Sequence, residues 1–240
     1  MQRFPVNRSN IIDNQVNISG SDYKHIAKVL RLKQGNEITL FDETGTEYLG
    51  EITRINSRKI MISISGTKSV ETESKLSITL LQGIPKGDKM DIIIEKATEL
   101  GVKEIVPVVT ERSQIRHTQK IQRWQRIASE SLKQCRRFIA PKIHGVVNFE
   151  QALKNNINGQ LRIILHKKNQ DKLKNKIKNT SQHTDNITVL VGPEGGFSNE
   201  EVATAEESGF IQIGLGPRIL RTETAAIAII SILQFEYGDI

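Results

Sequence analysis

The chain has 240 residues, a formal net charge of +7 and a single cysteine. Its composition is that of a globular protein long enough for one large domain or two smaller ones. No apolar run is long enough to span a bilayer, and one cysteine excludes an internal disulfide, so we expect a cytoplasmic protein without a membrane anchor.

The first 70 residues have the pattern of a β-rich domain. Runs of β-forming residues between turn signals predict strands at 36–41, 46–55 and 59–65. One short helix is expected over 21–30. We therefore predict a β-barrel with one helix as a first domain over 1–70, followed by a polar linker over 67–75.

From residue 76 onward, predicted strands and helices alternate. This order predicts an α/β domain over 74–240 with a mostly parallel sheet. Strands are expected at 76–81, 102–109, 161–165, 187–191 and 211–213, with Pro107 interrupting the second. Helices are expected at 88–100, 120–137, 198–208 and 222–236. Gly101 is placed to end the first of these helices, and Ser198 and Glu201 have the spacing of a capping box.

Two glycine-proline segments follow strands in the last quarter of the chain. The first is Gly-Pro-Glu-Gly-Gly at 192–196, and the second is Leu-Gly-Pro-Arg-Ile-Leu-Arg-Thr-Glu-Thr at 215–224. Rigid turns at the carboxyl ends of neighbouring strands form the ligand crevice of an open α/β sheet. A tight strand–helix connection would also use glycines, but two such segments in succession favour a binding site. Neither matches a dinucleotide fingerprint or a P-loop.

Positive charge is concentrated between residues 112 and 142. This region holds nine Lys or Arg residues and one acid, Glu130. On a helix over 120–137, Arg123, Arg126 and Arg137 lie opposite the apolar face. A row of exposed cations contacts phosphates and gives salt-sensitive binding with little base specificity. Ordinary helix amphipathicity would produce the same stripe, but the scarcity of acids favours nucleic acid.

The sequence offers no motif for a metal or a covalent nucleophile. Its five histidines lack metal-ligand spacing, so no metal is expected. Cys135 falls on the apolar face of the predicted helix, and no Gly-x-Ser-x-Gly run is present. Catalysis through a nucleophilic side chain is therefore not expected.

Four segments in order resemble the RsmE family of ribosomal RNA small-subunit methyltransferases, within the SPOUT superfamily. These segments are the runs at 87–102, 130–141, 192–196 and 215–224. The last of them is a highly specific motif. The stretch 25–32 also matches the amino-terminal domain of the family, so the resemblance covers nearly the whole chain.

The resemblance implies a PUA-like β-barrel that helps bind RNA, followed by a SPOUT domain. The segment from about 187 to 236 of that domain would thread a deep trefoil knot, a rare chain topology. The family methylates N3 of a uridine in 16S rRNA, uses S-adenosylmethionine, and works as a homodimer. The 30S subunit is the expected form of the substrate, and free 16S rRNA stays open as the alternative. The cofactor-binding residues implied are Leu165, His166, Gly192, Pro193, Glu194, Gly195, Gly196, Leu215, Gly216, Ile219, Leu220, Arg221, Thr222 and Thr224.

Methyl transfer from a sulfonium requires alignment of the reactants rather than a covalent intermediate. The uridine imide must also lose its proton. We expect Arg221 to stabilise the developing anion or hold the nucleotide, with Glu223 and Glu194 as candidate bases. A side chain introduced at Gly195 is expected to block the cofactor. The residues expected to contact RNA are Arg31, Lys86, Lys89, Arg112, Arg116, Arg123, Arg126 and Arg137.

Three other functions stay open at this point. A related SPOUT enzyme would methylate a ribose 2′-hydroxyl or act on tRNA. A non-catalytic RNA-binding ribosome-assembly factor would carry the same basic stripe but bind no cofactor. A metabolic α/β enzyme with a basic surface would bind RNA without salt sensitivity, if at all.

Overall fold

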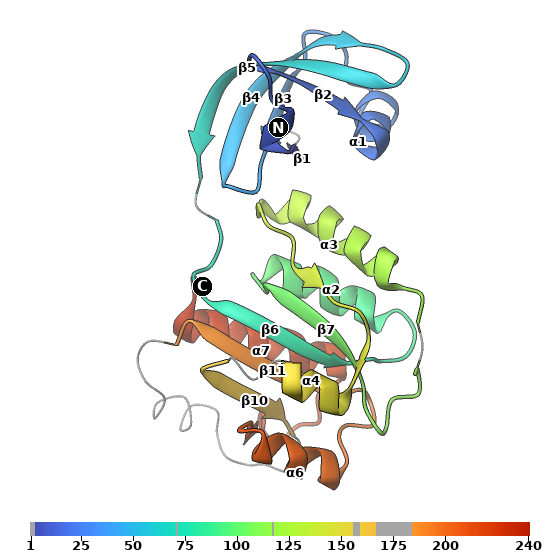
Figure 1. Cartoon of the computed structure of the whole chain (residues 1–240), viewed down its shortest axis with the longest axis vertical. Helices are drawn as coiled ribbons and strands as arrows, with labels where there is room; N and C mark the ends of the chain where they lie inside the picture. The colour runs from blue at the N-terminus through green and yellow to red at the C-terminus, as the bar shows by residue number, and fades with distance from the viewer. Residues whose placement is uncertain (1–2, 71, 117, 156–158, 167–183) are drawn as a thin grey trace. The chain divides into compact units, whose positions relative to one another are not determined.

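The structure is a computed structural model that describes residues 3–70, 72–116, 118–155, 159–166 and 184–240. Its internal contacts divide the chain into two units (Figure 1). The first unit consists of Met1–Glu73 and Lys133–Ile139, and the second of Ser74–Leu132 and Ala140–Ile240.

The first unit is built on a five-stranded sheet in the order β1-β3-β4-β5-β2. Its strands are β1 (Arg3–Pro5), β2 (Gln15–Ser19), β3 (Glu37–Phe41), β4 (Thr46–Ile55) and β5 (Lys59–Ser69). The three predicted strands are confirmed as β3, β4 and β5, whereas β1 and β2 were not predicted. A 3-10 turn, η1 (Arg8–Asn10), precedes β2. The predicted helix is also confirmed, as α1 (Gly20–Lys24) running directly into the π-helical turn η2 (His25–Val29).

The chain returns to the first unit at Lys133, in the last turn of helix α3 (Ile121–Cys135). This helix ends two residues before the predicted boundary, because Arg136 adopts the left-handed conformation with φ 65°. Arg137 is only 3% exposed and forms an ion pair with Glu73 at 2.8 Å. The prediction that Arg137 lies on an exposed basic face is therefore wrong, and a buried, paired guanidinium is not available to phosphates.

The second unit contains a seven-stranded sheet in the order β12-β10-β11-β6-β7-β8, with β9 also paired to β7. Its strands are β6 (Ser77–Gly83), β7 (Glu104–Val109), β8 (Lys142–Ile143), β9 (Val147–Asn148), β10 (Leu161–Leu165), β11 (Asn186–Val191) and β12 (Ile211–Ile213). All the pairings described for this sheet are parallel, which confirms the predicted sheet type. Strands β8 and β9 were not predicted, because two residues are too few for a periodic pattern.

Pro107 does not interrupt β7, contrary to the prediction. It pairs in register with Gln82 of β6. On the other side of β7, the pairing with β8 ends at Ile105 and the pairing with β9 begins at Val108. The missing N–H of the proline therefore falls where that side of the strand has no paired partner, a position that a strand tolerates.

Helices cover both faces of the parallel sheet (Figure 1). Helices α2 (Lys89–Glu99), α3 and α7 (Thr222–Tyr237) share one apolar cluster with the sheet, and α4 (Phe149–Asn155) and α6 (Asn199–Glu207) share another. Neighbouring residues of one strand belong to opposite clusters, as with Leu80 and Leu81 of β6, because side chains alternate along a strand. The predicted capping box at Ser198 is confirmed. None of the helices in the described ranges combines the length and the apolar character needed to cross a membrane.

Candidate functional site

A pocket of about 340 Å³ lies at the carboxyl ends of β10, β11 and β12. Strand β11 lies between β10 and β6, and β12 lies on the opposite side of β10. The loops that follow β11 and β12 therefore leave the sheet on either side of β10. This edge is where open α/β sheets bind ligands, and the volume lies in the range of small-molecule sites.

Most of the cofactor residues implied by the resemblance line this one pocket. They are Leu165, His166, Gly192, Pro193, Glu194, Gly195, Gly196, Leu215, Gly216, Ile219, Leu220, Arg221 and Thr222. Thr224 does not line it and lies in the first turn of α7. Lining residues that the sequence reasoning missed are Val191, Phe197, Ile213, Arg218 and Ala225. Four of these are apolar residues next to the predicted loops, a pattern shared with any buried strand end; Arg218 lies inside the recognised motif.

The loop glycines have different surroundings. Gly196 and Gly216 have φ values of 67° and 92°, and a Cβ added at either position would meet no atom within 4 Å. Both line the pocket, so the space beside their main chain suits a ligand that approaches the backbone closely. At Gly195, in contrast, a Cβ would lie 2.9 Å from the Cβ of Arg112. The expectation for Gly195 is therefore corrected, because a side chain there would first meet Arg112.

Glu194 is ion-paired at the edge of the pocket. Its Oε1 lies 2.6 Å from Nζ of Lys89 and accepts a hydrogen bond from the backbone N–H of Lys86 at 3.1 Å. Partial burial acts to raise the pKa of Glu194, but the hydrogen bonds from Lys89 and from backbone N–H groups outweigh it and hold this pKa below its ordinary value. A carboxylate with a lowered pKa is a weaker base, so these surroundings disfavour Glu194 as the general base.

Glu223, the other candidate base, lies in the first turn of α7 and outside the lining of the pocket. Its Oε2 is buried and has no hydrogen-bond partner among the residues described. The negative charge sits near a helix N-terminus, where the helix dipole favours it. Glu223 is therefore in a position that a helix dipole favours, and it does not line the pocket.

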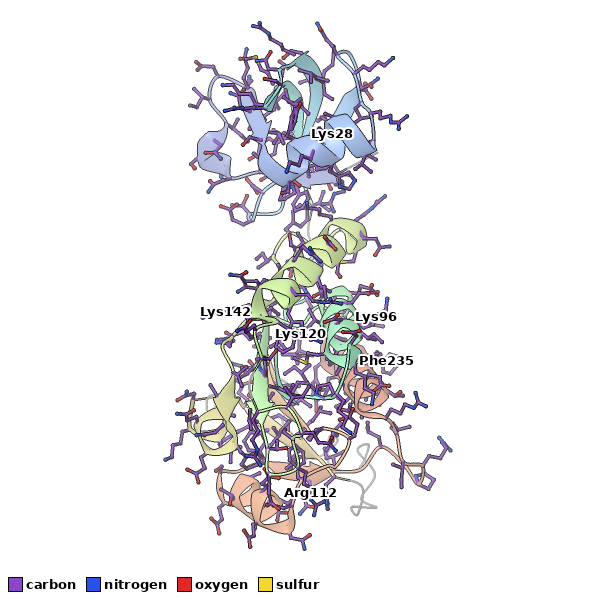
Figure 2. The ribbon with its side chains drawn as sticks, turned by 90° about the vertical axis from the view of Figure 1, so that its right-hand side faces the viewer. Lys28, Lys96, Arg112, Lys120, Lys142 and Phe235 are labelled. Atoms are coloured by element: carbon purple, nitrogen blue, oxygen red, sulfur yellow. The ribbon has the colours of Figure 1, made fainter. Side chains whose placement is uncertain are left out.

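Four cationic side chains line the pocket: Lys89, Arg112, Arg218 and Arg221. Nη1 of Arg112 (Figure 2) donates to the carbonyl oxygen of Gly195 at 3.1 Å. Arg218 and Arg221 are exposed, and Arg221 is the N-cap residue of α7. Among the lining residues, all of which are described, the sole acid is the Glu194 carboxylate that pairs with Lys89. The pocket therefore carries an excess of positive charge, which favours the phosphates of a nucleic acid that lies beside it.

Acids at the start of α2, the N-cap residue Asp88 and Asp91, neutralise part of the predicted basic stripe. A guanidinium nitrogen of Arg123 lies 2.6 Å from Oδ2 of Asp91, and Nε1 of Trp124 donates to the other oxygen of that carboxylate at 3.1 Å. Lys120 (Figure 2) pairs with Asp88 at 3.2 Å. The expectation that the stripe lacks compensating acids is wrong at these positions, because the acids come from a different helix.

The remaining predicted RNA contacts belong to both units. Arg31 is exposed in the first unit, where its φ is 53°. Arg116 is exposed in the second unit and donates to the carbonyl oxygen of Glu111 at 3.4 Å. Lys86 contributes its backbone N–H to Glu194. Lys89 and Arg112 line the pocket, where Lys89 pairs with Glu194 and Arg112 donates to the carbonyl oxygen of Gly195.

Substitution of Arg126 is the clearest test of RNA binding by α3. Its side chain is 71% exposed, and its contact with Glu130 is a distant 3.7 Å, a geometry that contributes little. We expect Arg126→Glu to weaken RNA binding and to lower the slope of log K against log salt by about one. Melting temperature and cofactor affinity should stay unchanged. Filter binding at several salt concentrations measures this.

Arg123→Glu is the contrasting variant. It should weaken RNA binding and also destabilise the protein, because it places a second carboxylate beside Asp91. If Arg126→Glu bound RNA as tightly as the wild type at every salt concentration, α3 would not be part of the RNA surface.

Two family models match the chain. One described as an RNA methyltransferase domain matches residues 72–234, and one described as an RNA methyltransferase PUA domain matches residues 18–65. The ribosomal RNA small subunit methyltransferase E of Buchnera aphidicola subsp. Acyrthosiphon pisum is 36% identical to the chain over 227 residues, covering 92% of this chain and 88% of that protein. The chain belongs to this family, the RsmE family.

Further relatives and solved structures agree with this assignment. The RsmE protein of Bacillus subtilis is 28% identical over 91% of this chain and 89% of its own length. The crystal structure of the RsmE protein of Neisseria gonorrhoeae bound to S-adenosyl methionine has a TM-score of 0.90, with 33% identity, and the match covers 100% of this chain and 99% of that one. The resemblance seen in the sequence is thus confirmed, and with it a PUA-like domain followed by an α/β methyltransferase domain with a parallel sheet.

Proposed function

We propose that this chain transfers a methyl group from S-adenosylmethionine to N3 of a uridine in 16S rRNA. The pocket is the observation that carries the proposal. It is formed by the loops at 192–196 and 215–222, in an RsmE-family chain that is 33% identical to a relative crystallised with S-adenosyl methionine. We assign the RNA-binding domain to 1–70 and the catalytic domain to 74–240.

The residues of the pocket fit this cofactor. The open space beside Gly196 and Gly216 lets main-chain groups reach the adenosine, and the apolar Leu165 and Leu220 provide surface for its base. When bound, S-adenosylmethionine supplies a methyl group already activated on a sulfonium. The loops therefore need only to orient the reactants and exclude water, and no protein nucleophile is required.

We infer that Arg221 assists loss of the uridine N3 proton. Its guanidinium lies at the exposed edge of the pocket, at the start of α7. A cation at this point stabilises the imide anion as charge develops, which lowers the cost of losing the proton. Since Glu194 is held ionised by Lys89 and Glu223 lies outside the pocket, we infer that solvent water takes the proton.

Glu194→Gln tests the assignment of the base. A general base is worth about 10²–10⁴-fold in rate, whereas we expect this variant to retain kcat within about tenfold. Cofactor affinity should fall slightly, because the contact with Lys89 loses its charge. Single-turnover rates from pH 6 to 9 measure kcat, and a loss of three orders of magnitude would restore Glu194 as the base.

The pH dependence of the free energy of unfolding tests whether the pKa of Glu194 is lowered in the folded protein. The folded pKa of Glu194 is below its ordinary 4.5, so its ion pair stabilises the fold fully above pH 4.5, and this contribution disappears as pH falls through the folded pKa. Glu194→Gln should lack that acid-side loss.

The knot, the homodimer and the 30S substrate are also proposals for this chain. The Thr222 hydroxyl donates to the carbonyl oxygen of Gly192 at 2.6 Å, a contact between the start of α7 and the preceding loop that is compatible with a knot over about 187–236. Phe235 (Figure 2) is 71% exposed on α7 and Ile232 is 39% exposed, which supports homodimer formation through this helix. We propose that the dimer acts in the cytoplasm, on the 30S subunit.

Methyl transfer from labelled cofactor onto 30S subunits and onto naked 16S rRNA, followed by nucleoside analysis, tests the function. We expect N3-methyluridine, formed faster on 30S subunits. A labelled ribose 2′-O-methyl group would show instead the related SPOUT activity. Absence of heat on calorimetric titration with S-adenosylmethionine would identify a non-catalytic RNA-binding factor.

A further inference from the structure

A buried side-chain amide contacts residues that flank the two loops of the pocket. Gln82 is in β6, is 0% exposed, and does not line the pocket. Its Nε2 donates to Oγ1 of Thr222 at 3.0 Å and to the carbonyl oxygen of Gly83 at 2.9 Å. It also lies 3.5 Å from the carbonyl oxygen of Val191, at the end of β11. One amide group thus contacts the ends of two strands and the start of α7.

The chemistry of the partners determines the direction of these hydrogen bonds. Carbonyl oxygens only accept, so the amide nitrogen of Gln82, and not its oxygen, must face Gly83 and Val191. The Thr222 hydroxyl has one proton, which it donates to the carbonyl oxygen of Gly192 at 2.6 Å. That hydroxyl therefore accepts from Gln82, and a directed chain runs from Gln82 through Thr222 to Gly192.

This chain connects segments that the sequence places far apart. Gly192 begins the loop after β11, and Thr222 is the first residue of α7, directly after the loop that follows β12. Close packing reinforces the connection, because a Cβ at Gly83 would lie 2.5 Å from Cδ and 2.7 Å from the nitrogen of Pro193. The carboxyl end of β6 therefore supports the first loop by direct contact, while the Gln82 amide couples it to the second.

Stability alone does not account for an amide at this place. Oε1 of Gln82 is buried and has no hydrogen-bond partner in the part of the chain that the structure describes. A buried, unpaired amide oxygen is destabilising, and an apolar side chain of similar size would remove that oxygen, although it would also remove the donor to the carbonyl oxygen of Gly83. What the amide provides, and an apolar side chain would not, is the donor that orients Thr222.

We propose that Gln82 is a positioning residue that, through Thr222, sets the placement of the two cofactor loops relative to each other. This inference rests on the proposed function, because the ligand of the loops is S-adenosylmethionine. Loss of the amide should leave the fold intact but release the Gly192 carbonyl and the start of α7 from a common partner. Cofactor affinity should then fall more than stability does.

Gln82→Leu and Gln234→Leu form a matched pair for the test. Gln234 is also 0% exposed in the same unit, but its Oε1 accepts from Ser74 and its Nε2 donates to the carbonyl oxygen of Leu100, each at 2.8 Å. We expect Gln82→Leu to raise the Kd for S-adenosylmethionine by about tenfold, with a melting temperature within about 4 °C of the wild type. Gln234→Leu should lower the melting temperature and leave the Kd unchanged. Calorimetric titration and thermal unfolding measure both quantities.

Two further variants separate positioning from packing. Thr222→Ser keeps the hydroxyl and should bind the cofactor within about threefold of the wild type, whereas Thr222→Val keeps the shape and should lose about tenfold. The double variant Gln82→Leu with Thr222→Val should bind no more weakly than the weaker single variant, because both interrupt one chain of hydrogen bonds.

The outcomes distinguish a failure of the proposed function from a failure of the positioning role of Gln82. If the wild-type protein did not bind S-adenosylmethionine, the proposed function itself would be overturned. If the wild type bound it and Gln82→Leu bound equally well, only the positioning role would be overturned. Should Gln82→Leu fail to fold, equal cofactor affinity of Thr222→Ser and Thr222→Val would overturn that role.

Discussion

Arg221→Ala is expected to lower kcat for methyl transfer by about 10²–10³-fold, the loss typical of removing one donor that stabilises a developing anion. The side chain is exposed and precedes α7 without making a side-chain cap to it, so the fold should be retained. The rate is measured under single-turnover conditions with 30S subunits and saturating cofactor, and folding by circular dichroism.

Arg218→Ala is the matched control for Arg221→Ala, because both residues are exposed, line the pocket and belong to the same loop. If only the net charge of the pocket mattered, both variants would lose rate equally. We expect Arg218→Ala to keep kcat within about tenfold, since an exposed charge that does not contact the reacting atoms is strongly screened. Turnover by Arg221→Ala at the wild-type rate would remove Arg221 from the mechanism.

Gly216→Val is expected to weaken cofactor binding about a hundredfold. A side chain at this position would project into open space where Gly216 lines the pocket, so it would occupy volume that the ligand needs. Forcing atoms into an occupied site costs about 1–3 kcal/mol, which corresponds to roughly a hundredfold in Kd at the upper end. Calorimetric titration with S-adenosylmethionine measures the affinity.

Gly35→Val controls for backbone strain in the Gly216→Val experiment. Gly35 has φ 88°, close to the 92° of Gly216, and a Cβ there also meets no atom within 4 Å, but the residue lies in the first unit. Both substitutions force a β-branched residue into the left-handed region and should cost about 1–3 kcal/mol of stability. Only Gly216→Val should lose cofactor affinity, and equal affinities would place the cofactor elsewhere.

In the second unit, local patterns in the sequence were sufficient for the longer elements, but β8, β9 and α4 were not predicted. The predicted strand at 161–165 is β10 without any shift of its ends, and the capping box at Ser198 is formed. These features depend on residues within one turn or one strand, and the physics that determines them is therefore local. The glycine-proline loops were predictable for the same reason, because the residues that form each turn are also the residues of the motif.

The role of each charged residue was decided by the tertiary structure. Lys89 lies 105 residues from Glu194 in the chain, yet their ion pair lowers the pKa of the carboxylate that the sequence offered as a base. Arg137 looked exposed on a helical projection and is buried against Glu73. A charge takes its properties from whichever opposite charge or carbonyl the packing brings within a few ångströms, and spacing along the chain does not carry that information.

Gln82 is the clearest example of a residue whose strand is predictable from the sequence and whose contacts are not. Its position near the end of β6 follows from an apolar run, so the strand was predictable, while nothing in that run distinguishes it from an ordinary strand end. Its contact with Thr222, 140 residues later in the chain, exists only because β6, β11 and α7 meet beneath the pocket. The sequence by itself determined the parallel sheet and the two loops, because periodicity and turn chemistry are local; the fold decided which polar groups support those loops, because hydrogen-bond partners are set by distances in space.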